Sequence, residues 1–185
     1  MRVVSIKVLK TERLVIRPFT SKDAEFILRL LNESSFLRHI GDKEVRTLNQ
    51  AVSYLLDGPI RSYGLHGHGL MRVEIRETGV PIGMCGLLRR QPTQDPDLGY
   101  AFLPEFWGKG YAIEAAAAIL EASVRVLGFL RILALVSPGN ARSILLLQKL
   151  GFILAGSDPS HPGDPPTSLY EWNSENARQA PSAIL

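Results

Sequence analysis

The sequence predicts a single α/β (α+β) domain in which one chain of 185 residues supplies both a sheet and the helices that cover it. Hydrophobic residues make up 45% of the chain and charged residues 21%, a mixture that supports a sizeable core. Residues 70–88 hold two strand-like runs around a tight turn, and residues 98–127 pass from a strand through a glycine-rich turn into a helix. Strands and helices that alternate in this way are typical of a sheet flanked by helices.

The first two elements are a strand and a helix. Residues 14–19, LVIRPF, are rich in β-branched side chains and end near Pro18, which predicts a strand. Residues 20–33 place apolar side chains at helical spacing after Thr20 or Ser21, and either of these residues can cap a helix.

A second helix and a hairpin follow. Residues 47–58 continue the helical spacing, and Gly58 followed by Pro59 predicts that this helix stops there. A Thr78-Gly79 turn divides residues 70–88 into two strands. On the first of these strands apolar and charged side chains alternate, Met71, Val73 and Ile75 against Arg72, Glu74 and Arg76.

The second half of the chain continues the alternation. Residues 98–103 predict a strand that ends at Pro104, and the helix after the glycines is expected to run to Leu127 and to end at Gly128. The apolar stripe predicted for this helix consists of Ile113, Ala116, Ala117, Leu120, Val124 and Leu127.

Residues 140–151 predict a further helix, with Asn140 as its N-cap and Gly151 after its last turn. The last residues, 174–185, are expected to form a loose tail. Three further strands are expected, at residues 131–136, 152–156 and 168–172.

Composition and charge argue against several function classes. No apolar run reaches the roughly 18 residues of a membrane span, and the N-terminus lacks the pattern of a signal peptide, so we expect a cytoplasmic protein without a membrane partner. Cys85 is the only cysteine, which excludes an internal disulfide and a thiolate metal cage. The net charge of +3 comes from scattered Lys and Arg, so DNA binding is not implied, whereas a small polyanion fits.

The stretch WGKGYAIEAA, residues 107–116, raises the question of a ligand site. A strand, a tight turn and a helix N-terminus together direct several free backbone N–H groups one way, which favours phosphate. The dinucleotide-binding fingerprint would need glycine in place of Ile113, and the P-loop would need serine or threonine in place of Gly110. A packing turn without any ligand is the alternative interpretation.

The same stretch resembles the pyrophosphate loop of the GCN5-related N-acetyltransferases, with Trp107 in place of the usual glutamine or arginine. In family order, TERLVIRPF, GVPIGMCGL, DLGYAFLPEFWGKGYAIEA and NARSILLLQKLGF resemble four segments of that family, in particular of its ribosomal-protein-alanine N-acetyltransferase branch. The resemblance implies one domain over residues 11–173. It also implies a mixed, mostly antiparallel central sheet flanked by helices, with two strands splayed at an acetyl-CoA site.

The resemblance further implies which residues hold acetyl-CoA, without any metal. Phe102 and Leu103 would offer backbone contacts to the cofactor, and Asn140 and Ser143 would lie near its pantetheine arm. The pyrophosphate would be held by Gly108, Lys109, Gly110, Tyr111 and Ala112. Many members carry a tyrosine seven residues after the asparagine as general acid, and this chain has Leu147 there. Ser143 is the expected substitute, although it can equally serve only the helix cap.

The attacking amine must lose a proton, so a base or a water chain is needed. Asp97, just before the splayed strand, is the first candidate and Glu74 in the hairpin is the second; an ordinary solvated carboxylate is the alternative for both. His66 and His68 lack further ligands at metal spacing, so contact of either one with the acceptor is favoured over metal binding, and an incidental pair of loop histidines is the alternative interpretation.

The functional expectation is therefore an acyltransferase that moves an acetyl group from acetyl-CoA to a primary amine by direct transfer in a ternary complex. The acceptor is the amine of a protein N-terminus or of a small molecule, and the enzyme is a monomer or a homodimer. The alternative is a non-catalytic acyl-CoA-binding or sensor protein, which the leucine at position 147 favours.

Overall fold

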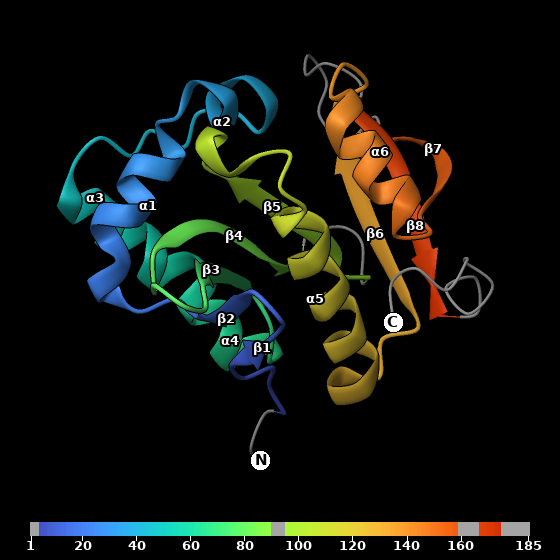
Figure 1. Ribbon diagram of the computed structural model, residues 1–185, viewed down its shortest axis with the longest axis horizontal. Helices are drawn as coiled ribbons and strands as arrows, with labels where there is room; N and C mark the ends of the chain where they lie inside the picture. Colours follow the sequence, from blue (N-terminus) through green and yellow to red (C-terminus); the bar gives the residue numbers. More distant parts are fainter. Residues whose placement is uncertain (1–3, 90–94, 159–166, 175–185) are drawn as a thin grey trace.

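Eight strands form one sheet in the computed structural model, which describes residues 4–89, 95–158 and 167–174 (Figure 1). Their order is β1-β2-β3-β4-β5-β6-β8-β7, and among the described strands only β5 and β6 run parallel. The predicted mixed, mostly antiparallel sheet is confirmed. The strands are β1 (Leu9–Lys10), β2 (Leu14–Pro18), β3 (Leu70–Ile75), β4 (Pro81–Leu88), β5 (Asp97–Phe102), β6 (Arg131–Val136), β7 (Ile153–Asp158) and β8 (Thr167–Asn173).

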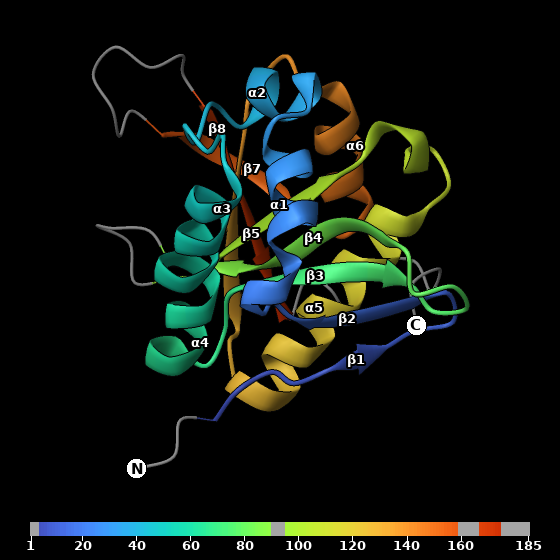
Figure 2. The same ribbon diagram turned by 90° about the vertical axis from the view of Figure 1, so that its left-hand side faces the viewer.

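Helices cover both faces of this sheet. α5 and α6 share one hydrophobic cluster with the sheet, here called the α5 cluster, while α1 and α3 share the α1 cluster on the other face, which comes forward in Figure 2. The helical elements are η1 (Ser21–Asp23), α1 (Ala24–Leu31), α2 (Ser34–His39), α3 (Leu48–Leu55), η2 (Leu56–Ile60), α4 (Arg61–His66), η3 (Pro104–Phe106), α5 (Tyr111–Leu127) and α6 (Ala141–Lys149).

Side chains of β4 and β5 alternate between the two clusters, as a pleated strand requires. Cys85, Leu98 and Phe102 belong to the α5 cluster, whereas Met84 and Leu103 belong to the α1 cluster. Cys85 is fully buried, as its apolar sequence neighbours indicate. Even-numbered side chains of β5 therefore face α5 and α6.

The parallel strands β5 and β6 are paired at one position only, Asp97 with Leu133. The Leu133 N–H donates to the Pro96 carbonyl at 2.9 Å, and Arg131 forms ion pairs of 2.6 Å with Asp95 and 2.7 Å with Glu171 beside this contact. In contrast, β5 pairs with β4 along its whole length. The two halves of the sheet therefore diverge beyond Asp97, and this predicted splay is present (Figure 1).

The predicted end of the second helix at Gly58-Pro59 is wrong. α3 ends at Leu55, but the chain continues helically through the π-helical turn η2, which contains Pro59, and then through α4 to His66. The wider π turn accommodates the proline ring and its missing N–H, so the helical path is not broken.

The buried stripe of α5 also differs from the predicted one. Ala116 and Leu120 of the predicted stripe are buried, and its other members, Ile113, Ala117, Val124 and Leu127, are partly buried against the α5 cluster. The fully buried residues that the stripe missed are Ala115, Ile119, Ala122 and Ser123. Four of the six buried residues of α5 are alanine or serine, and such small side chains allow close approach of helix and strands.

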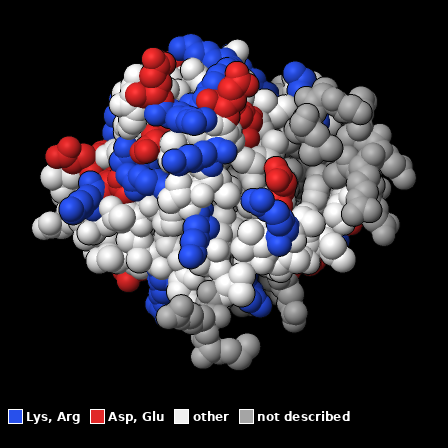
Figure 3. All heavy atoms as spheres, turned by 60° about the horizontal axis from the view of Figure 1, so that its bottom comes forward, with Lys and Arg blue, Asp and Glu red and all other residues white. Residues whose placement is uncertain are grey.

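Residues 175–185 of the predicted tail lie outside the described residues. No helix within the described ranges is long and apolar enough to cross a membrane. On the face shown in Figure 3, lysines and arginines stand singly or beside acidic residues, so the described part of this face has no continuous basic patch.

Candidate functional site

Two glycines with left-handed backbone angles form the turn before α5. The φ angles are 73° at Gly108 and 82° at Gly110, a region that costs other residues about 1–2 kcal/mol. α5 begins at Tyr111, and the first turn of a helix has backbone N–H groups without partners inside the helix. The turn therefore presents free N–H groups and the positive end of a 17-residue helix, which together suit an anion.

An ion pair from Arg13, just before β2, fixes this turn. The Glu114 carboxylate accepts hydrogen bonds from the Thr11 hydroxyl at 2.6 Å, the Arg13 N–H at 3.0 Å and Arg13 Nε at 2.7 Å. Arg13 Nη1 donates to the Lys109 carbonyl at 2.9 Å, and its guanidinium lies 4.7 Å from the centroid of the Tyr111 ring. Burial alone would raise the pKa of Glu114, but these hydrogen bonds outweigh it and lower the pKa. Sequence reasoning did not identify Arg13.

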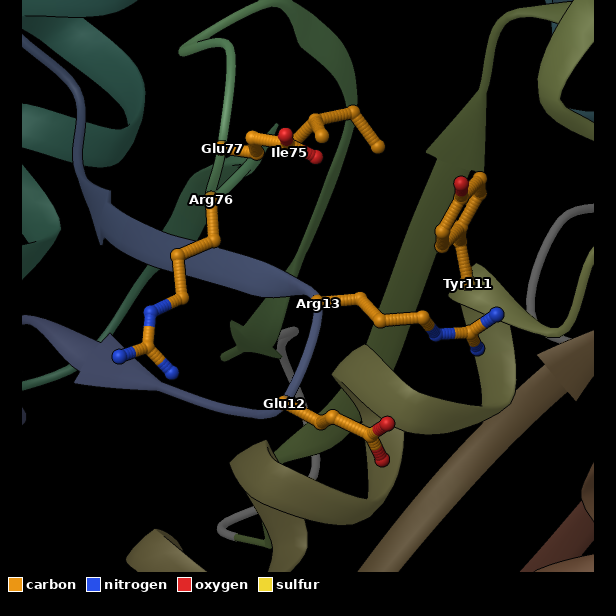
Figure 4. A pocket seen from close by; sticks show the side chains of 6 residues that line it. All are labelled: Glu12, Arg13, Ile75, Arg76, Glu77 and Tyr111. Carbon is orange, nitrogen blue, oxygen red and sulfur yellow. The ribbon is translucent and has the colours of Figure 1, made fainter.

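A cavity of about 480 Å³ lies beside the turn, on the side of the β2–β3 edge (Figure 4). In Figure 4 the Arg13 side chain extends from the start of β2 toward α5. Two arginines and two glutamates balance the charge of the cavity wall, which consists of Glu12, Arg13, Ile75, Arg76, Glu77 and Tyr111. The cavity wall therefore carries balanced charge, whereas the glycine turn presents the positive end of α5 and its free N–H groups.

The backbone of β5 faces the diverging β6 at its even-numbered residues. The Leu103 N–H donates to the Ile82 carbonyl of β4 at 2.9 Å, so in an antiparallel pair the neighbouring residue Phe102 turns its N–H and carbonyl the other way. The Phe102 carbonyl accepts from the Trp107 indole Nε1 at 2.8 Å, and the Leu103 carbonyl accepts from the Phe106 N–H at 3.0 Å. Of the two residues expected to contact the pantetheine arm, Phe102 therefore keeps its N–H directed toward the divergence.

The N-terminus of α6 lies across the divergence from β5. The Asn140 side chain accepts from the Ser143 N–H at 3.2 Å, which confirms the predicted cap. The Tyr100 hydroxyl, from β5, donates to the Ser143 carbonyl at 3.4 Å. Leu147, one turn further along α6, is 1% exposed in the α5 cluster. Sequence reasoning did not identify Tyr100, although a tyrosine on the buried side of a strand usually directs its hydroxyl to a partner.

Two cations stand at the rim of the glycine turn. The Lys109 ammonium lies 5.4 Å from the centroid of the Phe106 ring, and the Arg142 guanidinium lies 5.2 Å from the centroid of the Trp107 ring. Arg142 belongs to the first turn of α6, which contains no acidic residue. A cation in that position opposes the helix dipole, a signal that sequence reasoning overlooked.

The two carboxylates expected to act as bases lie in different places. Asp97 is 4% exposed and occupies the point where β5 and β6 meet, at the base of the divergence. Glu74 lies on β3, two strands from β5, and pairs with Arg72 at 2.9 Å and Arg17 at 3.5 Å. The buried Asp23 joins the same cluster through a 2.8 Å pair with Arg17. The structure thus brings Asp97 to the divergence and Glu74 into an ion-pair cluster.

The two histidines lie at the opposite end of α5. His68 is buried, with its Nδ1 3.1 Å from the Leu87 carbonyl and its ring edge against Phe129, and burial lowers the pKa of its imidazole. Together with His66 and Arg89 it lines a second cavity of about 470 Å³. No group of three or more potential metal ligands gathers anywhere in the described ranges.

Comparisons with known proteins agree on one family. The acetyltransferase (GNAT) domain model matches residues 13–153. The uncharacterized N-acetyltransferase YoaA of Bacillus subtilis is 29% identical over 147 residues, which cover 78% of this chain and 82% of YoaA.

Two solved structures show the same fold. The acetyltransferase from Agrobacterium tumefaciens is 26% identical and superimposes with a TM-score of 0.76 over 91% of this chain and 95% of that one. The ribosomal-protein-S5-alanine acetyltransferase from Vibrio fischeri is 20% identical, with a TM-score of 0.72 over 91% and 97% of the two chains.

Proposed function

This chain belongs to the GNAT acetyltransferase family and is an acetyl-CoA-dependent N-acetyltransferase, and from that premise we propose that it transfers the acetyl group directly to a primary amine in a ternary complex. The observation that carries the proposal is the divergence of β5 from β6 beyond Asp97, with the glycine turn beside it. Membership of this family also favours an enzyme over the alternative of a non-catalytic acyl-CoA-binding or sensor protein.

Acetyl-CoA is assigned to the gap between the diverging strands β5 and β6 and to the glycine turn before α5. The Phe102 N–H and the Asn140 side chain stand on opposite sides of the divergence and contact the pantetheine arm. The backbone N–H groups of residues 108–112 hold the pyrophosphate, because the helix dipole of α5 and the absence of Cβ atoms at the glycines favour phosphate there. Arg142 adds a positive charge at the same rim.

The chemistry requires a neutral amine and a stabilised leaving group. The amine nitrogen attacks the thioester carbonyl, the carbon–nitrogen bond forms, and collapse of the tetrahedral intermediate breaks the carbon–sulfur bond. Asp97, at the base of the divergence, accepts the amine proton, directly or through water. The Ser143 hydroxyl, at the N-terminus of α6, donates a hydrogen bond to the thiolate.

The acceptor is proposed to be the amine of a protein N-terminus or of a small molecule. The fold shared with an alanine acetyltransferase of a ribosomal protein supports the first class. The surface that binds the amine acceptor is assigned to residues 32–69, which include α2, α3, η2 and α4 beside the α1 cluster.

A free-thiol release assay with acetyl-CoA tests the proposal against N-terminal peptides, polyamines and aminoglycosides, with CoA binding measured by calorimetry in parallel. Thiol release with one class of amine identifies the acceptor. Binding of CoA without thiol release from any amine would contradict the proposed reaction. Asp97→Asn should flatten the pH–rate profile, and Ser143→Ala should lower the turnover number; unchanged values would remove these two roles.

A further inference from the structure

The departing CoA thiolate must take up a proton, and α6 offers no side-chain hydroxyl at Leu147. This leucine is 1% exposed and packs in the α5 cluster. In an α-helix the carbonyl of residue 143 accepts the N–H of residue 147. The Tyr100 hydroxyl donates to that same Ser143 carbonyl, so it lies beside the turn of α6 that carries Leu147.

Tyr100 reaches this place from the strand that borders the divergence. It is an even-numbered residue of β5, so its backbone faces β6 while its side chain packs against the α5 cluster, beside Cys85 on β4. The side chain is half-buried, which leaves part of it accessible. Its 3.4 Å hydrogen bond is long and therefore weak, so the hydroxyl turns to another acceptor at small cost.

We propose that Tyr100 is the general acid of the reaction and protonates the sulfur of CoA. This inference rests on the proposed function. As the carbon–sulfur bond breaks, the electron pair stays on sulfur and the Tyr100 proton forms the S–H bond of free CoA. The tyrosinate then regains a proton from water, while the proton of the attacking amine leaves through the base or the water chain.

The surroundings of Tyr100 suit this task. Burial raises the pKa of Tyr100 to about 12, although its hydrogen bond to Ser143 opposes the shift, so the hydroxyl is protonated at neutral pH. Ser143 and Tyr100 then have separate roles, because the serine hydroxyl stabilises the thiolate and the tyrosine supplies the proton.

Tyr100→Phe tests the inference, because it removes one oxygen atom and keeps the ring. The turnover number should fall roughly 100-fold, the usual size of a general-acid contribution, while the CoA dissociation constant from calorimetry and the melting temperature stay unchanged. Tyr170→Phe, at a buried tyrosine on β8, is the matched control and should retain full turnover.

Three outcomes would overturn the inference. Turnover of Tyr100→Phe within twofold of wild type would show that the hydroxyl gives no proton. A loss of CoA affinity or of melting temperature at unchanged turnover would show that Tyr100 only binds cofactor or holds α6 through the Ser143 carbonyl. Absence of thiol release from the wild type with every amine would instead reject the proposed function, and this inference with it.

Discussion

The ion pair between Arg13 and Glu114 connects the start of β2 to the first turn of α5, just after the glycine turn, and Glu114→Gln tests how much stability this ion pair contributes. Glutamine keeps the shape and one acceptor oxygen, but its NH₂ group must face a donor, either the Arg13 guanidinium or the Thr11 hydroxyl and Arg13 N–H. Burial alone would raise the pKa of Glu114, but these hydrogen bonds outweigh burial and lower it.

The expected loss follows from the contacts. A hydrogen bond to a charged group contributes about 1.5–3 kcal/mol, and because the Arg13 side chain is 43% exposed we discount this to about 1–2 kcal/mol. For a chain of this length each kcal/mol corresponds to roughly 2–4 °C, so the melting temperature of Glu114→Gln should fall by about 2–8 °C.

Thermal denaturation at pH 7 measures this loss, with Glu121→Gln, at an exposed position of the same helix, as control. Since the folded pKa of Glu114 is below its ordinary 4.5, the stabilisation is present above that pH and is lost on acidification. The difference between wild type and variant should therefore shrink below pH 4.5. Melting temperatures equal to the control at pH 7, or a difference that grows in acid, would refute the reasoning.

Three further predictions concern backbone strain, acid stability and the cofactor rim. Gly108→Ala and Gly79→Ala both place a Cβ in open space at positive φ, so each should lower the free energy of unfolding by about 1–2 kcal/mol. Only Gly108→Ala should also weaken CoA binding in calorimetry. Equal CoA affinities of the two variants would contradict a phosphate site at the turn. Burial alone would raise the pKa of Asp23, but its hydrogen bonds with two arginines and a backbone N–H lower the pKa well below the ordinary 3.8. The wild type should therefore lose stability as the pH falls through and below 4. Melting temperatures measured over an acid pH series check this, and Asp23→Asn should show little of that loss. Arg142→Ala should weaken CoA binding roughly tenfold, whereas Arg125→Ala, at the far end of α5, should bind CoA as the wild type does. Equal CoA affinities of the two variants would show that Arg142 is not part of the site.

Short sequence signals determined the ends of several helices and the position of the hairpin in this protein. Glycines at 108, 110 and 128 fixed both ends of α5, and Asn140 fixed the start of α6, because a left-handed angle or a side-chain cap depends on a few adjacent residues. The same locality explains the correct hairpin at residues 70–88, since alternation and a turn residue are read within one short stretch.

The tertiary structure alone decided which distant residues meet. No spacing in the sequence joins Arg13 to Glu114, 101 residues apart, or Tyr100 to Ser143, 43 residues apart. It also decided that η2 continues the helical path past Pro59 and that α5 buries Ala115, Ala122 and Ser123 beside its large side chains Ile119 and Leu120. These outcomes depend on how closely helix and sheet approach, and packing distance is a property of the whole core that no local pattern contains.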